Sequence, residues 1–189
     1  MLDVCAAPGG KTAQLLCGGA NVTAIDISKV RIRRLKENLD RLGLKAELIH
    51  ADIKKWTTSR LFDFIFLDAP CSATGTIRRN PDVLIHKTYE DVQKLSIVQM
   101  EILQKVSKLV RPGGQLVYCT CSLQYEEGEA QVDRFLSKNT GFNRDPISLH
   151  EIGSVCDAIN VNGDLRLLPY HLNKNEGVDG FFASRLTRK

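Results

Sequence analysis

Apolar runs and helical patterns alternate along most of the chain, and this alternation constrains the fold more than any other feature of the sequence. The predicted strands are residues 1–5, 21–26, 46–52, 61–70 and 115–120. The predicted helices are residues 28–43, 90–110 and 126–138. Strands that alternate with helices are typical of β-α-β units around a mostly parallel sheet. The sequence therefore predicts an α/β fold, and its 189 residues, 43% of them hydrophobic, suffice for one domain with one core.

Local signals mark the ends of several of these elements. Ser28 is expected to cap the first predicted helix and Gly43 to end it. The "RPGG" sequence at 111–114 is expected to turn the chain into the strand that follows, and the segments 165–171 and 178–186 predict a closing antiparallel hairpin. The positions expected to face the core are Ile32, Leu35, Leu39 and Leu42 in the first helix and Leu95, Val98, Ile102, Val106 and Leu109 in the second.

Polar and reactive residues follow the predicted strands, at the points where each strand ends. Asp3 and a glycine-rich loop follow the first strand, while Asp26 and Asp52 end the second and third. The sequences "DAPCS" at 68–72 and "TCS" at 120–122 end the fourth and fifth. A single aspartate in such a place is usually a cap or turn residue. In a parallel sheet, however, these ends meet at one edge where ligands bind, so five such ends together predict a binding site.

The loop "CAAPGGKT" at 5–12 differs from the common phosphate-binding loops. A P-loop requires glycine where this chain has Cys5, and G-x-G-x-x-G is absent. The remaining small residues let a ligand approach the backbone amides closely. A ligand that carries adenosine, with Asp26 at its ribose hydroxyls and Asp52 near its adenine, fits this pattern. S-adenosylmethionine is the ligand that we expect.

Composition limits the cellular setting and the partners. Six cysteines without regular spacing or a signal peptide do not predict a disulfide framework, so we expect a reducing, cytoplasmic location. The longest strongly apolar run, "FIFL" at 64–67, is too short to span a membrane. A net charge of +4 permits an anionic partner without requiring one. The four histidines are scattered, and Cys119 and Cys121 lack the paired C-x2-C spacing of a structural zinc site, so no metal is expected.

Four sequence motifs resemble the NOL1/NOP2/Sun family of RNA cytosine-C5 methyltransferases, most closely its bacterial Sun (RsmB) type, which acts on 16S ribosomal RNA. These motifs are "DVCAAPGGKT", "DAPCSATGTIRRNPD", "YCTCS" and "DGFFASRL", and in the expected order they cover nearly all of the chain. The resemblance implies a Rossmann-like, S-adenosylmethionine-dependent methyltransferase fold with a C-terminal antiparallel hairpin. It also implies that residues 1–189 form the catalytic domain. The cofactor-binding residues implied are Cys5, Ala6, Ala7, Pro8, Gly9, Gly10, Lys11, Asp26, Asp52 and Asp68.

The same resemblance implies that Cys121 is the nucleophile and that Cys71 helps to release the product. Cytosine C5 is a poor nucleophile, so a thiolate must first add at C6. Asp68 is expected to protonate or hydrogen-bond cytosine N3 if its surroundings favour the protonated form, with Lys11 orienting Asp68 or touching the base. DNA cytosine methyltransferases attack instead with the cysteine of a proline-cysteine motif, which here is Cys71. The additional "TCS" favours the RNA arrangement.

Contacts with RNA are less well specified by the sequence. Arg78 and Arg79 follow the "DAPCS" loop and are candidates for phosphate contacts, whereas the helix arginines Arg31, Arg33 and Arg34 are expected to be solvated. The target cytosine must leave any base stack to meet a thiol, which favours a loop or a locally opened RNA. Buried, inert thiols are expected at Cys17, Cys119 and Cys156.

Two departures from the family pattern keep other functions open. The family carries upstream elements and, in Sun-type members, a helical RNA-binding domain, so we expect this chain to be a fragment whose first strand is incomplete. Gly128 stands where the family often has asparagine, a change that is expected to loosen the loop behind Cys121. A non-catalytic fragment that binds cofactor or RNA is therefore one alternative. Another is a methyltransferase for a small molecule or protein, whose activity does not require Cys121.

Overall fold

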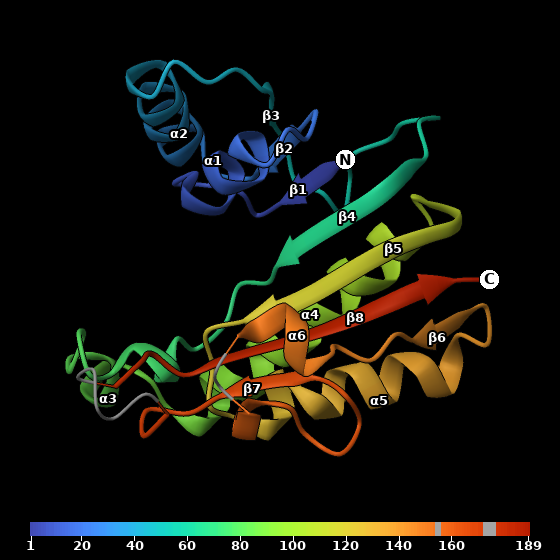
Figure 1. Cartoon of the computed structure of the whole chain (residues 1–189). Coiled ribbons are helices and arrows are strands. Elements are labelled where there is room, and N and C mark those ends of the chain that lie inside the picture. The colour runs from blue at the N-terminus through green and yellow to red at the C-terminus, as the bar shows by residue number, and fades with distance from the viewer. Residues whose placement is uncertain (154–155, 172–176) are drawn as a thin grey trace.

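The computed structural model describes residues 1–153, 156–171 and 177–189, and within them eight strands form one mixed sheet (Figure 1). The order across the sheet is β3-β2-β1-β4-β5-β8-β6, and β7 pairs with β8. The strands are β1 (Leu2–Val4), β2 (Thr23–Asp26), β3 (Glu47–His50), β4 (Phe62–Asp68), β5 (Val110–Thr120), β6 (Phe142–Arg144), β7 (Leu165–Leu167) and β8 (Phe181–Arg188). The first five run parallel, and β8 runs antiparallel to β5. The predicted α/β fold with a mostly parallel sheet and an antiparallel C-terminal pair is confirmed.

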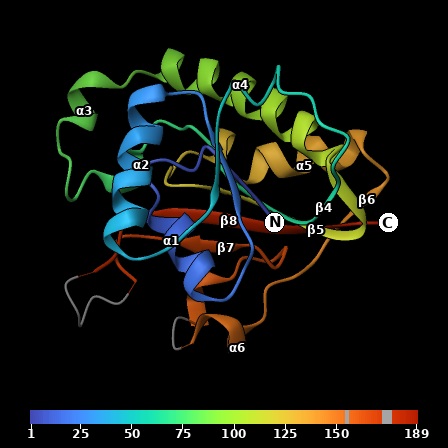
Figure 2. The same cartoon turned by 90° about the horizontal axis from the view of Figure 1, so that it is seen from above.

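Helices cover both faces of this sheet. Figure 2 shows α4 and α5 on one face, with α1 and α6 on the other. The helices are α1 (Gly10–Cys17), α2 (Lys29–Arg41), α3 (Val83–His86), α4 (Tyr89–Ser107), α5 (Glu129–Lys138) and α6 (Leu149–Ile152). Short 3-10 turns lie at η1 (Thr74–Thr76), η2 (Tyr125–Glu127) and η3 (Cys156–Ala158). Within the described part of the chain, none of the helices combines the length and apolarity needed to span a bilayer.

The core is divided between the two faces because successive strand residues point in opposite directions. On β2, Ile25 packs into the hydrophobic cluster that lies beneath α4 and α5. Its neighbour Ala24 packs into a second hydrophobic cluster, beneath α2. Asp3 of β1 is buried on the α1 side, where its carboxylate accepts a hydrogen bond from Thr12 Oγ1 at 2.6 Å. The strand that carries the "DAPCS" loop, β4, lies in the middle of the sheet, between β1 and β5.

The ends of α2 follow the sequence signals, but its predicted buried face is too long. The Ser28 hydroxyl accepts from Arg31 N at 3.3 Å, and Gly43 has a left-handed φ of 67° just after the helix. Leu35 and Leu39 are buried. Leu42 was expected to be buried with them and is 48% exposed, because it is the C-cap residue and the chain turns away at Gly43.

The long helix α4 begins with a capping box between Thr88 and Asp91. Ile102 and Val106 are buried as predicted, and so is Leu109 just beyond its end, whereas Leu95 and Val98 are only partly buried.

The "RPGG" segment is not the turn that was expected before a strand, because it lies within β5. Val110 pairs with Phe62 and Gln115 with Phe64, so residues 111–114 together oppose Asp63. Arg111 forms an ion pair with Asp63, and a Cβ on Gly114 would lie 2.8 Å from the Asp63 carbonyl oxygen. The two glycines thus let a bulge fold against the neighbouring strand.

The C-terminal strand β8 is enclosed on both edges. One edge pairs with β5, while the other pairs with β7 at 181–183 and with β6 at 186–188. The predicted hairpin is confirmed as the β7–β8 pair, but β6 was not predicted. The helix predicted at 126–138 begins later, at Glu129, because η2 occupies Tyr125–Glu127.

Candidate active site

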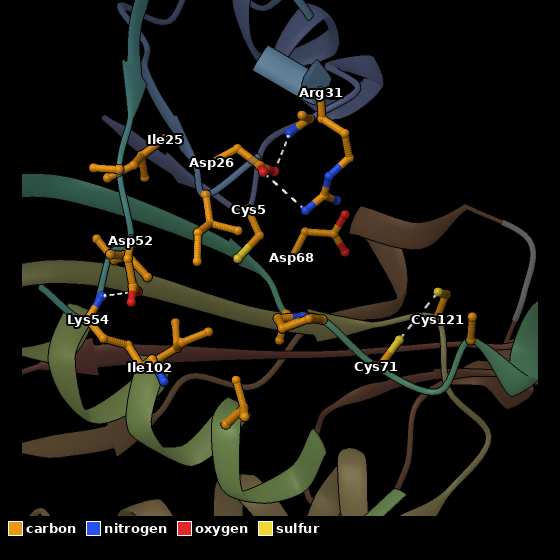
Figure 3. Close-up of a pocket in the computed structure, with 18 residues that line it drawn as sticks. Cys5, Ile25, Asp26, Arg31, Asp52, Lys54, Asp68, Cys71, Ile102 and Cys121 are labelled. Carbon is orange, nitrogen blue, oxygen red and sulfur yellow. Dashed lines mark hydrogen bonds and ion pairs between the residues drawn. The ribbon is translucent and has the colours of Figure 1, made fainter. Parts of the chain in front are cut away.

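A cavity of about 360 Å³ opens at the C-terminal ends of β1, β2 and β4, the edge at which the sequence predicts a site. Figure 3 shows its lining side chains, with Asp52 and the cysteine pair at opposite ends of the labelled set. Seven of the predicted site residues line it: Cys5, Ala7, Asp26, Asp52, Asp68, Cys71 and Cys121. Residues from the ends of five strands, β1 to β5, therefore meet around one space.

The Asp26 carboxylate organises the wall formed by the first two loops. One oxygen accepts from Ala7 N at 3.2 Å, and the other accepts from Ser28 N at 2.9 Å. Arg31 approaches the same carboxylate at 3.1 Å and lines the cavity, so the expectation that Arg31 is merely solvated is wrong (Figure 3). Asp26 itself is almost completely buried. Its contacts hold the glycine-rich loop against the start of α2.

The other loop residues predicted for the cofactor lie behind this wall. A second cavity, of about 170 Å³, is lined by the predicted residues Ala6, Pro8, Gly10 and Lys11 and shares Ala7 and Asp68 with the first. Gly9 lines neither of these two cavities. Its φ is 101°, and a Cβ there would lie 2.9 Å from the Leu35 side chain. Gly9 thus allows the loop to pack on α2.

Lys11 and Asp68 form an ion pair between the two cavities, with Lys11 Nζ donating to Asp68 Oδ2 at 2.7 Å. Burial lowers the pKa of the Lys11 ammonium, but the Asp68 carboxylate more than offsets this and the net shift is upward. The ion pair holds the Asp68 side chain at the junction of the two cavities.

Cys71 and Cys121 lie in contact, with their Sγ atoms 3.4 Å apart (Figure 3). The pKa of the Cys121 thiol is lowered, first by the hydrogen bond from Cys71 and further by the positive charge of Lys11. The pKa of Cys71 is raised, because it donates that hydrogen bond and is buried. The pair thus favours a thiolate at Cys121 beside a neutral thiol at Cys71.

The other cysteines differ from one another in their surroundings. Cys119 is fully buried, as predicted, and burial raises its pKa. Cys17 is exposed, because it lies at the end of the short helix α1, so its predicted burial is wrong. Burial raises the pKa of Cys5 to about 12, which leaves this cavity-lining thiol unreactive. The side chain of Cys156 lies outside the described residues.

The two arginines predicted to contact RNA both face Asp179. Arg79 forms a bidentate ion pair with this carboxylate, and Arg78 Nε lies 3.9 Å from it. Asp179 belongs to the "DGFF" segment, which therefore meets the loop after β4. Nothing in the sequence indicated a role for Asp179, because its partner Arg79 lies 100 residues away.

Other cavity residues were missed because they are apolar. Val98 and Ile102 of α4 and Ala51 and Ile53 after β3 complete the walls. Helical periodicity assigned the first two to the core, and no local signal distinguishes a residue beneath a ligand from one beneath a strand. The cavity is thus mostly apolar, with carboxylates at a few positions.

This chemistry fits S-adenosylmethionine. The volume lies in the range of small-ligand sites. The apolar walls suit an adenine ring, and the buried Asp26 carboxylate is an acceptor for ribose hydroxyls. Among the described residues, no group of three or more histidine, cysteine or acidic side chains is arranged to hold a metal ion.

Comparisons with known proteins identify the family of this chain. The family model described as "16S rRNA methyltransferase RsmB/F" matches residues 1–187. The "Ribosomal RNA small subunit methyltransferase B" of Salmonella arizonae is 41% identical over 194 residues, which is all of this chain but 42% of that protein.

Two solved structures are also similar. The crystal structure of PH0851 has a TM-score of 0.85 at 32% identity, covering 98% of this chain and 42% of that one. NSun6 from Pyrococcus horikoshii, crystallised with SFG, has a TM-score of 0.81 at 34% identity, covering 99% and 47%. This chain thus spans less than half the length of these relatives. The fold is that of S-adenosylmethionine-dependent methyltransferases, and the chain belongs to the 16S rRNA methyltransferase RsmB/F family, whose cofactor is S-adenosylmethionine.

Proposed function

We propose that residues 1–189 form the catalytic domain of an S-adenosylmethionine-dependent RNA methyltransferase that modifies C5 of a cytosine in 16S ribosomal RNA. One observation supports this chemistry above all: two thiols from separate loops lie 3.4 Å apart beside a cavity suited to the cofactor. The names of the relatives supply the substrate class. A cytoplasmic location, expected from the sequence, belongs to the same proposal.

The cofactor-binding part of the proposal assigns Asp26 to the ribose hydroxyls and Asp52 to the adenine. Cys5 and Ala7 line the same cavity, Ala6, Pro8 and Gly10 line the smaller cavity behind it, and Gly9 lets this loop pack on α2. When bound, S-adenosylmethionine supplies an electrophilic methyl group on a sulfonium and leaves as a neutral thioether.

Cys121 is the proposed nucleophile. Its thiolate adds to C6 of cytosine, forming the S–C6 bond while the electrons of the C5=C6 double bond become available at C5. C5 then takes the methyl group. The lowered pKa of Cys121 favours this assignment, because the thiolate is the attacking species.

Cys71 is proposed to assist release. The proton on C5 must leave, the C5=C6 double bond must re-form, and the C6–S bond must break with its electron pair returning to Cys121. Once Cys121 is bonded to C6 it carries no charge that disfavours a Cys71 thiolate, so Cys71 gives its proton to water. The Cys71 thiolate, which lies in contact with Cys121, then takes the proton from C5. Lys11 and Asp68 act as a pair in which Lys11 orients the Asp68 side chain. Asp68 must take up a proton before it donates a hydrogen bond to cytosine N3, because an ionised carboxylate is an acceptor only.

Arg78 and Arg79 are proposed to contact phosphates beside a cytosine that has left its base stack. Both arginines face Asp179, so each must leave this carboxylate when it binds a phosphate of the RNA.

The experiment that tests this function uses cytosine-containing ribosomal RNA and S-adenosylmethionine with wild type, Cys71→Ala and Cys121→Ala. The readout is a protein–RNA band that resists denaturation. Cys71→Ala is expected to accumulate this adduct, because release is blocked, and Cys121→Ala is expected to form none. An adduct that persists in Cys121→Ala but disappears in Cys71→Ala would reverse the two roles.

Two other outcomes separate the remaining alternatives. Absence of adduct from every variant, with intact cofactor binding, would mean that this chain alone binds cofactor without modifying RNA. Methyl transfer that persists in Cys121→Ala would favour a small-molecule or protein substrate.

A further inference from the structure

Glu127 is a fully buried acidic residue that the proposed chemistry does not use. Its Oε1 accepts from Ser72 N at 2.9 Å and from Gln99 Nε2 at 3.0 Å. Its Oε2 accepts from the hydroxyls of Ser72 and Ser122, both at 2.5 Å. An ionised carboxylate has acceptors only, so it matches a site at which four donors converge. Acidic side chains are rarely fully buried in proteins unless they are paired in this way.

The two serines that Glu127 contacts are the residues that follow the two paired cysteines. Ser72 comes directly after Cys71 on the loop from β4, and Ser122 comes directly after Cys121 on the loop from β5. The serine hydroxyls also lie 3.2 Å from each other. One carboxylate therefore joins the two loops at the residues next to the thiols.

Glu127 is itself held from two directions. Tyr118 of β5 donates its hydroxyl to the Glu127 carbonyl at 2.7 Å. Gln99 of α4, besides its bond to the carboxylate, donates to the carbonyl of Pro70 at 2.9 Å, one residue before Cys71. The sheet and α4 thus fix the carboxylate, and the carboxylate fixes both loops.

We propose that Glu127 is a positioning residue that holds the Cys71 and Cys121 loops in register, so that the two thiols lie in contact. The effect of this positioning on methyl transfer rests on the proposed function, whereas the contact between the two thiols does not. Glu127 then positions each cysteine through its hydrogen bond to the serine that follows that cysteine.

The variant that tests this proposal is Glu127→Gln. Glutamine keeps the size but replaces one acceptor oxygen with an NH₂ donor, so at least one of the four donors loses its acceptor. Ser122→Ala removes the hydrogen bond from the Ser122 hydroxyl to Glu127. Ser72→Ala removes the bond from the Ser72 hydroxyl and keeps the one from Ser72 N, so it weakens the connection to the Cys71 loop. Glu126→Gln makes the same chemical change at the adjacent, half-buried position and is the matched control.

The first readout does not depend on methyl transfer. The rate at which iodoacetamide alkylates Cys121 in the full chain is followed against pH by mass spectrometry of its peptide. The groups that act on this thiol are Cys71, Asp68 and Lys11. If Glu127→Gln separates the thiols, the midpoint, which is the pH at which alkylation of Cys121 reaches half its maximal rate, rises toward the ordinary thiol pKa of about 8.5. It rises because Cys121 loses the hydrogen bond from Cys71. Glu126→Gln is expected to keep the wild-type midpoint.

A wild-type midpoint in a folded Glu127→Gln protein would overturn the proposal. If circular dichroism shows that Glu127→Gln does not fold, Ser122→Ala decides in its place: an upward shift supports the proposal and an unchanged midpoint overturns it.

The second readout is the yield of the protein–RNA adduct, which tests whether this positioning of the thiols matters for methyl transfer. Ser72→Ala is expected to accumulate adduct, as Cys71→Ala does, because the release thiol is displaced. Ser122→Ala is expected to form less adduct than wild type. Wild-type adduct levels in both serine variants would overturn the catalytic role. If Cys71→Ala also forms no adduct, the proposed function is refuted. The pH profile of Cys121 alkylation then still decides whether Glu127 holds the two thiols in contact.

Discussion

Gly75→Ala is expected to damage the site through steric overlap alone. Gly75 lies where three loops meet: its N–H donates to the Cys121 carbonyl at 2.9 Å, and its carbonyl accepts from Gly180 N at 2.8 Å. A Cβ on Gly75 would lie 2.7 Å from the Cys121 carbonyl oxygen and would overlap the carbonyl of Gly180. Favourable carbon contacts begin near 3.5 Å. Since the obstructing atoms belong to the backbone, no rotamer change relieves the overlap.

The size of the effect follows from this overlap. Overpacking typically costs about 1–3 kcal/mol. For a chain of this length each kcal/mol lowers the Tm by roughly 2–4 °C, so a fall of about 2–12 °C is expected. Separation of the loops also moves Cys121, so the yield of the protein–RNA adduct is expected to fall with it.

Gly141→Ala is the matched control. Neither Gly75 nor Gly141 has a left-handed φ, and nothing lies within 4 Å of a Cβ at Gly141. The two substitutions thus lack the strain of a left-handed φ and differ in the space available to the new Cβ. Gly141→Ala is expected to stay within about 0.5 kcal/mol of wild type. Thermal unfolding by circular dichroism measures both variants. Equal Tm values for the two would refute the steric argument.

Three further predictions concern charged residues. Asp26→Asn is expected to weaken S-adenosylmethionine binding about ten- to a hundredfold in calorimetry, since hydrogen bonds to a charged group contribute about 1.5–3 kcal/mol. Burial raises the pKa of Asp3 to about 6, from 3.8 in the unfolded chain, so stability falls as pH rises between these values. Asp3→Asn is therefore expected to raise the Tm at pH 7.5 and to converge with wild type near pH 4. Arg79→Ala is expected to reduce the slope of log RNA affinity against log salt by about 1 in filter binding.

Short-range signals predicted the part of the site that lies at strand ends. Asp26 and Asp68 end β2 and β4, and parallel pairing through β1 brings both ends to one edge. Knowledge of the alternating pattern was enough to place them together. The boundaries of α2 were predicted for the same reason, because the Ser28 cap and the turn at Gly43 depend on nearby residues.

Contacts between distant residues were not predictable in this way. Asp179 pairs with Arg79 across 100 residues, and no local pattern in the sequence indicates that these two residues meet. The bulge at 111–114 escaped prediction because proline and glycine signal a change of direction, whereas the pairing of β5 with β4 on both sides of the segment keeps it in the sheet.

Gly128 shows how a residue's effect depends on a distant neighbour. The sequence alone led us to expect that this glycine loosens the loop behind Cys121. A Cβ at Gly128 would overlap the Arg166 guanidinium, which donates to the Ser122 carbonyl at 2.7 Å and is ion-paired with Glu129. Arg166 also lies over the Phe182 ring, 4.8 Å from its centroid. The space next to Gly128 is therefore filled by a charged side chain that holds the Ser122 backbone, while Glu127 holds the Ser122 hydroxyl, so the loop is supported on both sides.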